Sequence, residues 1–173
     1  MQAFAREGTP LIDTTLLQDL ERLAQDAHAP APDLAIAWQA RAELRAGTGT
    51  EDDVWLHLVA HGSVPLVCQR CMGTVDTPLT VDQWYRFVAT EDIAMAEDDE
   101  SEEDLLVMAP QFDLLSLLED ELLMALPLVP MHGQCPVAPT MQAGEDALQS
   151  DAPAAGEKPN PFAMLAQLKK KND

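Results

Sequence analysis

The sequence has few cysteines, few basic residues and no long apolar run, and each shortage excludes a class of protein. No stretch approaches the roughly 20 apolar residues that a helix needs to cross a bilayer, so no membrane contact is expected. Residues 1–10 contain no apolar run, so no secretory signal is expected. The cysteines number three, which is too few, and odd, for a secreted disulfide framework. We therefore expect a cytoplasmic protein.

Basic residues are the scarcer of the two charged classes. Ten Lys and Arg face thirty Asp and Glu, which gives a formal net charge of −20. Between Phe87 and Glu157 the chain has seventeen acidic residues and no basic one. Because wide contact with a phosphate backbone depends on Lys and Arg, this surface would repel naked RNA. The charge fits either simple solubility or a basic protein partner.

The hydrophobic pattern indicates several strands followed by a helix. Apolar and polar residues alternate over 34–45 and over much of 75–89, which predicts two β-strands. Residues 54–61 are mostly apolar on both faces and predict a strand between them, which 64–67 continue toward Cys68. Gly62 and Ser63 are expected to break or bulge the second strand. Leucines at helical spacing predict a first helix over Thr14 to Ala27.

A second leucine-rich helix is predicted from the N-cap Asp113 to about Leu126, with its acidic triplet 119–121 on the solvent face. Before it, the acidic run at about 94–104 is typical of a mobile loop, and residues 105–108 predict a short strand. Together these elements predict a single α+β domain over residues 1–140. Its sheet is mainly antiparallel, with an N-terminal helix and C-terminal helices.

The carboxyl-terminal part has a different composition. Residues 141–157 are rich in Ala, Gly, Asp and Pro, which predicts a flexible linker. In residues 158–173, Asn160 followed by Pro161 predicts the start of a short helix that leads into a basic tail. This helix either packs on its own domain or contacts a partner. The candidate contact residues for a partner or for RNA in this tail are Phe162, Leu165, Lys169, Lys170 and Lys171.

The three cysteines and one histidine form two short motifs. Cys68 and Cys71 make a Cys-x-x-Cys pair at the tip of a predicted hairpin, and His132 and Cys135 make a His-x-x-Cys pair. Together they would supply a closed tetrahedral structural zinc site with no position for a substrate water. Unliganded or redox-responsive thiols are the alternative. A catalytic dithiol is disfavoured, because a strand follows the pair where that chemistry needs a helix N-terminus.

No other pattern in the sequence indicates catalysis. We find no Ser-His-Asp arrangement, no paired-carboxylate site and no Gly-rich phosphate loop, so we expect neither an enzyme nor a small-molecule substrate. His57 and His61 share a strand face without nearby ligand residues. We expect both to be exposed or hydrogen-bonded structural histidines.

Three segments carry a family resemblance. Residues 67–71 hold the Cys-x-x-Cys pair after an apolar approach, residues 113–135 run from the helix cap through Leu-Pro-Leu-Val-Pro-Met-His to the third cysteine, and residues 158–169 contain Asn-Pro-Phe. In order and spacing they resemble the YceD family, the bacterial large ribosomal RNA subunit accumulation proteins. The resemblance spans the whole chain. It implies a cytoplasmic protein needed for synthesis, processing or stability of 23S ribosomal RNA, with no known catalytic activity.

The charge constrains how such a protein would act. A chain at −20 would not coat RNA, so we expect it to work in large-subunit assembly through a basic ribosomal or assembly-factor protein. Its association with rRNA would then be indirect, with contact confined to small basic spots such as Arg70 or the tail at 169–171. Two alternatives stay open: a direct RNA-binding module that shields precursor rRNA, and a zinc- or thiol-responsive regulator of translation.

Overall fold

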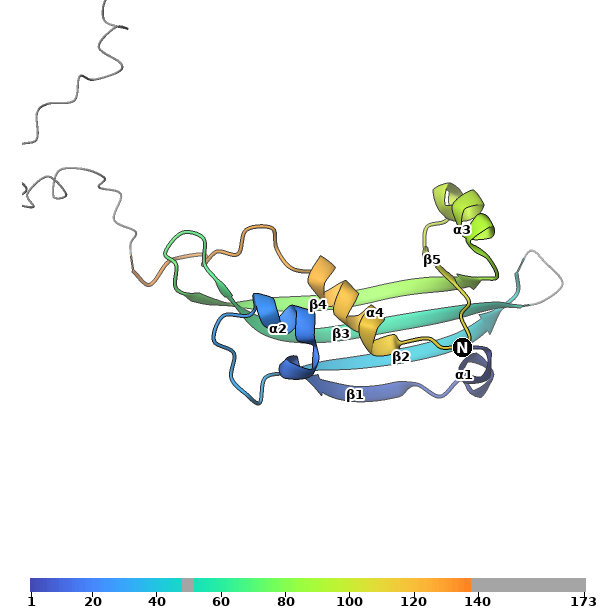
Figure 1. Ribbon diagram of the computed structural model, residues 1–173, viewed down its shortest axis with the longest axis horizontal. Helices are drawn as coiled ribbons and strands as arrows, with labels where there is room; N and C mark the ends of the chain where they lie inside the picture. Colours follow the sequence, from blue (N-terminus) through green and yellow to red (C-terminus); the bar gives the residue numbers. More distant parts are fainter. Residues whose placement is uncertain (48–51, 138–173) are drawn as a thin grey trace, which may run out of the picture. The chain divides into compact units, whose positions relative to one another are not determined.

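The computed structural model describes residues 1–47 and 52–137, and its centre is a five-stranded sheet in the order β1-β2-β3-β4-β5 (Figure 1). The strands are β1 (Leu11–Leu16), β2 (Ala35–Arg45), β3 (Asp53–Val67), β4 (Thr74–Val88) and β5 (Asp104–Val107). The helices are α1 (Gln2–Glu7), α2 (Glu21–Asp26), α3 (Glu91–Glu97) and α4 (Leu114–Met124), with the 3-10 turns η1 (Leu17–Asp19) and η2 (Asp98–Glu100). Strands β1 to β4 pair antiparallel, and only β5 pairs parallel, which confirms the predicted α+β class and mainly antiparallel sheet.

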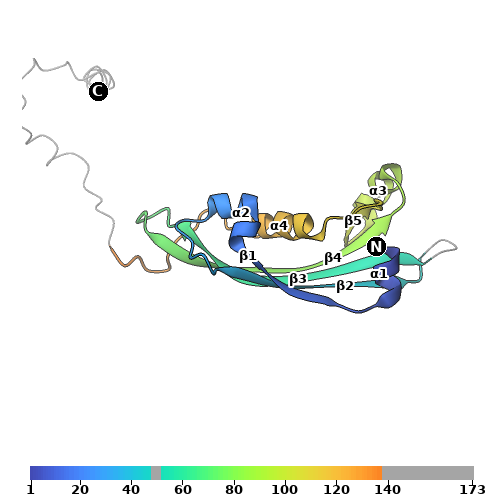
Figure 2. The same ribbon diagram turned by 60° about the horizontal axis from the view of Figure 1, so that its bottom comes forward.

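The two faces of the sheet differ sharply in burial, because successive side chains of a strand point to opposite sides. One face forms the core through Ile36, Trp38, Ala40, Ala42, Val54, Leu56, Leu58, Ala60, Leu79, Val81, Tyr85 and Phe87, all buried. Both α2 and α4 lie on this face, as Figure 2 shows, and add the buried Leu23, Leu118 and Leu122. Within the described residues, no helix combines the length and apolar content that a bilayer span requires.

The opposite face carries the alternate residues of the same strands, and we call it the open face. Its members are Ala37, Gln39, Arg41, Glu43 and Arg45 of β2, Trp55, His57, Val59 and His61 of β3, and Thr80, Asp82, Trp84 and Arg86 of β4. None of these residues is buried. The three long strands therefore bury one side of the sheet and leave the other in contact with solvent.

The helix predicted over Thr14 to Ala27 is confirmed only for its second part, α2, and is wrong before Glu21. Residues 11–16 form β1, which pairs with β2 from Leu11↔Ala40 to Leu16↔Ala35, and the helix begins only at Glu21. The side chain of Thr15 accepts a hydrogen bond from Trp38 Nε1 (2.8 Å), which fixes β1 against β2. Leu17, Leu20 and Leu23 do reach the core, from the 3-10 turn η1, the N-cap of α2 and the short helix α2. An N-terminal helix exists as α1, where none was predicted.

Strand β3 also differs from its prediction, because Gly62 and Ser63 do not break it. Pairing with β4 continues through Gly62↔Leu79 and Ser63↔Pro78 as far as Val67. A Cβ atom at Gly62 would lie 2.3 Å from Ile36 Cδ1. A larger residue would force the Ile36 side chain to shift, whereas glycine lets it pack against the strand backbone.

The loop predicted at about 94–104 is wrong, because this stretch contains the end of α3, the turn η2 and the start of β5. A single arginine of β4 organises it. Arg86 donates from Nε to Glu103 (2.6 Å), from Nη1 to Glu97 (2.8 Å) and from Nη2 to Ser101 Oγ (3.0 Å). The short strand predicted at 105–108 is confirmed as β5, shifted by one residue.

Replacing Arg86 with leucine will release the segment from α3 to β5. The arginine side chain is only 15% exposed, and its loss leaves Glu97 and Glu103 without their cation. We expect amide hydrogen exchange over residues 91–107 to accelerate at least about tenfold, while that of β3 stays unchanged. Arg41→Leu is the control, because Arg41 is 54% exposed and makes only a 4.0 Å ion pair. Equal exchange in both variants would disprove the role of Arg86.

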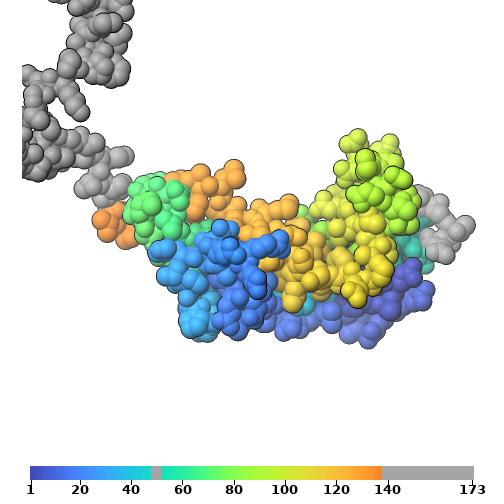
Figure 3. Space-filling model, in the orientation of Figure 1, coloured from blue at the N-terminus to red at the C-terminus, as the bar shows by residue number. Residues whose placement is uncertain are grey.

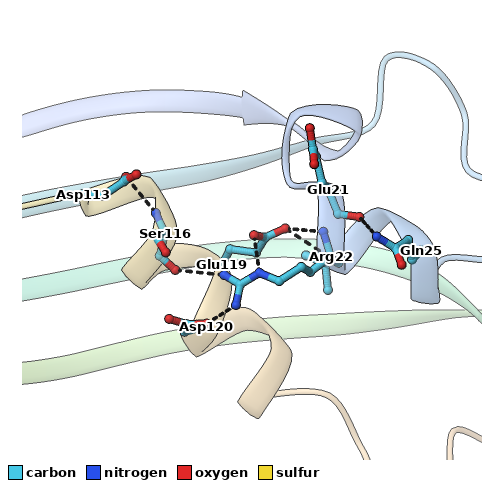
Figure 4. A network of polar contacts seen from close by, with 8 residues as sticks. Glu21, Arg22, Gln25, Asp113, Ser116, Glu119 and Asp120 are labelled. Carbon is cyan, nitrogen blue, oxygen red and sulfur yellow. Dashed lines mark hydrogen bonds and ion pairs between the residues drawn. The ribbon is translucent and has the colours of Figure 1, made fainter.

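The prediction that the acidic triplet 119–121 lies on the solvent face of α4 is wrong for two of its three residues. Glu119 and Glu121 are each 8% exposed, and only Asp120 is open to solvent. Glu119 Oε1 accepts from the backbone N–H of Arg22 (2.7 Å), and Oε2 accepts from Arg22 Nε (2.8 Å), as Figure 4 shows. Glu119 Oε1 also accepts from the backbone N–H of Leu23 (3.2 Å). The N-cap of α2 makes no side-chain capping bond of its own. Glu119 of α4 therefore caps α2 from a distant part of the chain.

The remaining domain predictions concern residues that the structure does not describe. The linker at 141–157 and the helix and tail at 158–173, with Phe162, Leu165 and Lys169 to Lys171, lie outside the described residues. The N-cap at Asp113 is confirmed, since its Oδ1 accepts the backbone N–H of Ser116 (3.0 Å).

Candidate metal centre

The Cys-x-x-Cys pair lies at the tip of the β3–β4 hairpin, as predicted. Cys68 follows the last residue of β3, and Cys71 precedes the start of β4. A tight turn joins them: Met72 N–H donates to Cys68 C=O (2.9 Å), and Cys68 N–H donates to Gly73 C=O (2.8 Å). Met72 takes a left-handed φ of 59° in this turn. The turn brings both sulfur atoms into one small cluster.

The segment after α4 brings the second motif to the same tip. In Figure 1, α4 runs along the sheet toward the hairpin tip, and the chain continues past it. Gln69 N–H then donates to Pro130 C=O (2.9 Å), and Arg70 Nη2 lies 3.9 Å from Met131 Sδ. Figure 3 shows the orange atoms of this segment against the green atoms of the hairpin. His132 and Cys135 thereby meet a pair far earlier in the sequence.

The four side chains have the spacing of one tetrahedral ligand set. Their ligand atoms all lie within 4.8 Å of one another. Cys68 Sγ lies 3.9 Å from Cys135 Sγ, and Cys71 Sγ lies 3.4 Å from His132 Nδ1. Zinc bonds of about 2.3 Å to sulfur and about 2.0–2.1 Å to nitrogen give tetrahedral edges of about 3.8 Å and about 3.6 Å. The group can therefore hold a metal ion, and these two separations fit zinc.

The turn also favours a thiolate at Cys68, whose side chain is buried. Burial by itself raises the pKa of the Cys68 thiol, but the backbone N–H groups of His132, Cys71 and Arg70 outweigh it and lower the pKa to about 5. Burial and hydrogen bonds with Cys71 and Cys68 instead raise the pKa of Cys135. A divalent cation among them would remove that opposition, because thiolates that bind zinc lose their protons.

The alternative of a reactive dithiol fits this geometry less well. Cys68 follows a strand, so no helix dipole acts on it as in thioredoxin-type sites. The arrangement suits a closed structural site better than a redox one.

Comparison with known proteins assigns the chain to a family. A family model described as large ribosomal RNA subunit accumulation protein YceD matches residues 56–169, well over half of the chain. The chain belongs to the YceD family. A relative from Haemophilus influenzae, named large ribosomal RNA subunit accumulation protein YceD, is 38% identical over 110 residues, which cover 62% of this chain and 61% of that relative. No solved structure matches the chain.

The YceD match covers the part of the fold that builds the candidate centre. It begins at Leu56 within β3 and includes β4, β5, α4 and all four candidate ligands. The separate alignment with the Haemophilus influenzae relative spans about three fifths of that relative's length. Strands β1 and β2 precede the residues that the family model matches, and the match ends at residue 169, where the predicted basic tail begins. The family resemblance noted from three sequence segments is therefore confirmed.

Of the candidate residues for contact with a partner or RNA, Arg70 is the one that the structure describes. It is exposed on the hairpin tip, directly beside the candidate ligands, and its side chain reaches Met131 rather than a carboxylate. The tail candidates Phe162, Leu165, Lys169, Lys170 and Lys171 stay predictions, because they lie outside the described residues.

Sequence reasoning missed an aromatic group on the open face. Trp84 stacks on His57 with ring centroids 4.2 Å apart and planes 3° from parallel, and it meets Trp55 edge-on at 6.4 Å. The guanidinium carbon of Arg45 lies 4.3 Å from the Trp55 ring and 4.1 Å from the Trp84 ring. The available signal was strand parity: Trp55 and His57 alternate with the buried Val54, Leu56 and Leu58, so they point away from the core.

Proposed function

We propose that this YceD-family protein is a non-enzymatic, cytoplasmic binding protein that supports the accumulation of large-subunit ribosomal RNA. Membership of the family carries the proposal, since both the family and the Haemophilus influenzae relative are named for large ribosomal RNA subunit accumulation. The proposed link to 23S ribosomal RNA, the large RNA of that subunit, follows from that name. The closed form of the candidate metal centre supports a binding protein rather than an enzyme, because four protein ligands leave no place for a reacting water.

The metal centre would be structural. Cys68, Cys71 and Cys135 would supply three thiolates and His132 one imidazole, a common zinc set. Bound zinc would cross-link the β3–β4 hairpin to the segment after α4. The residues themselves already hold that junction through the hydrogen bond from Gln69 to Pro130, so the ion would reinforce an existing contact.

Action through a basic protein partner is supported by the distribution of charge. Between residues 1 and 137 the chain has six arginines and no lysine. Four of these arginines already form ion pairs with carboxylates: Arg22, Arg41, Arg45 and Arg86. Few cations in the described part are thus available to neutralise phosphates, whereas a basic protein meets an acidic surface.

Deleting the gene will lower the ratio of 23S to 16S ribosomal RNA in growing cells. We expect the wild-type protein, supplied from a plasmid, to restore that ratio, because the chain and its named relative share the family. Quantitative electrophoresis of total RNA measures it, with messenger RNA levels of the neighbouring genes as the control for polar effects. An unchanged ratio in the deletion strain would disprove the proposed function.

A further inference from the structure

The open face of the sheet carries an aromatic group that lies outside the core. Two of the chain's three tryptophans, Trp55 and Trp84, lie there together with His57, although the core lies on the opposite side. Aromatic side chains gathered on a solvent-facing surface often mark an interaction site. Figure 2 shows that the helices α2 and α4 leave this side of the sheet bare.

We propose that the open face around Trp55, His57 and Trp84 binds an arginine-rich segment of a basic protein partner. This inference rests on the proposed function, because it names the surface that would hold the partner.

The aromatic group already binds one guanidinium of this chain. Arg45 lies within 4.3 Å of both indole rings, and its Nε donates to Glu43 (2.6 Å). Planar guanidinium groups stack on indole faces and at the same time pair with carboxylates. The surface therefore shows, with its own arginine, the contacts that a partner's arginine would use.

The charge beside the aromatic group favours a cationic occupant. Trp55 forms one wall of a cavity of about 690 Å³. The charged residues that line this cavity are Asp53, Arg86, Glu97, Glu100, Glu102 and Glu103. Arg86 pairs with Glu97 and Glu103, whereas Asp53, Glu100 and Glu102 form no ion pair within the described residues. An arginine or lysine side chain entering beside Trp55 would meet this uncompensated negative charge.

Single-stranded RNA is the competing occupant, since bases also stack on tryptophan. Phosphates would need free cations here, but Arg41 and Arg45 share Glu43, and His57 Nε2 lies 2.7 Å from Asp82 Oδ1. Asp53, Glu100 and Glu102, which would attract a basic segment, would repel a phosphate backbone. The uncompensated carboxylates of the cavity beside Trp55 thus favour a basic protein segment.

Titration calorimetry at physiological salt with the full chain tests the proposal. The probes are a short synthetic peptide in which arginine alternates with serine, its lysine counterpart, and an oligouridylate. The variant with Trp55→Leu and Trp84→Leu keeps the net charge of −20, so general attraction to the acidic chain is unchanged. We expect this variant to bind the arginine peptide about tenfold more weakly than wild type, and wild type to prefer arginine over lysine. Equal binding by wild type and variant would overturn the proposal.

Arg45→Ala gives a second test that does not depend on folding of the tryptophan variant. It vacates the position between the two indoles and frees Glu43, so the arginine peptide will bind several-fold more tightly. If RNA were the occupant, the same change would remove a cation and weaken binding of the oligouridylate. Weaker peptide binding, or oligouridylate binding that depends on the two tryptophans, would overturn the proposal.

An experiment in cells separates this inference from the proposed function. We expect the tryptophan double variant to restore less 23S ribosomal RNA to the deletion strain than wild type does. If it restores the full amount, the docking inference fails while the proposed function stands. If deletion leaves 23S unchanged, the proposed function fails, and the peptide titrations alone decide the surface.

Discussion

Replacing Cys68 with serine will remove bound metal and lower the midpoint of thermal unfolding by about 10 °C or more. Cys68 is the buried member of the four candidate ligands, and its sulfur receives the backbone N–H of His132 (3.4 Å). Serine keeps the size but supplies a poor zinc ligand in place of a thiolate. Without the ion, the segment after α4 would keep only a few hydrogen bonds to the hairpin. Calorimetry together with elemental analysis measures both effects.

Gln69→Ser is the matched control for this change. Gln69 occupies the same turn, is exposed and contributes no ligand atom to the cluster. We expect it to retain the metal and to unfold within a few degrees of wild type. Chelation will lower the unfolding midpoint of the wild-type protein to that of Cys68→Ser, and it will not change the midpoint of Cys68→Ser itself. A Cys68→Ser protein with wild-type metal content would refute the assigned ligand set.

Replacing Glu119 with alanine will destabilise the domain by about 3 kcal/mol, one of the largest single-residue effects that we expect outside the apolar core. The carboxylate is 8% exposed and accepts the backbone N–H groups of Arg22 and Leu23 at the start of α2. Its removal leaves these donors without partners and separates α2 from α4. Urea denaturation followed by circular dichroism measures the loss.

Asp120→Ala is the neighbouring control. Its carboxylate pairs with the same arginine, but its side chain is 50% exposed, so its loss will cost less than about 1 kcal/mol. Similar effects of the two substitutions would show that the buried cap adds nothing beyond a surface ion pair.

The contribution of Glu119 will also depend on pH with a defined sign. Desolvation alone would raise the pKa of Glu119, but the hydrogen bonds from Arg22 and Leu23 outweigh it and hold the pKa below its usual value. A carboxylate with a lowered folded-state pKa stabilises fully above its unfolded pKa of about 4.3 and loses that effect as the pH falls through the folded value. The stability difference between wild type and Glu119→Ala will therefore narrow in acid.

Local pattern was sufficient where one strand or helix buries its own apolar face. The alternation in residues 34–45 and 75–89 predicted β2 and β4, and Asp113 marked the start of α4 correctly. Prediction from local pattern failed where a residue or strand far away in the sequence determines the structure of a segment. The leucines at 17, 20 and 23 fit one long helix as well as a 3-10 turn followed by a short helix, and the pairing of β1 with β2 selects the second arrangement.

The same limit applies to the polar residues. Burial of Glu119 depends on Arg22, and the order of the acidic run depends on Arg86, so neither could be inferred from the surrounding sequence. The identity of the four candidate ligands was readable from their residue types. Their proximity was not, because it depends on α4 running back along the sheet to the hairpin tip (Figure 1).

Native mass spectrometry of the full chain, purified without chelator, tests most directly whether Cys68, Cys71, His132 and Cys135 form one metal centre. We predict one zinc ion per wild-type chain, and none in the variant with Cys68 and Cys71 both replaced by serine. A wild-type chain that stays metal-free after incubation with zinc, or a double variant that keeps the ion, would contradict the assignment.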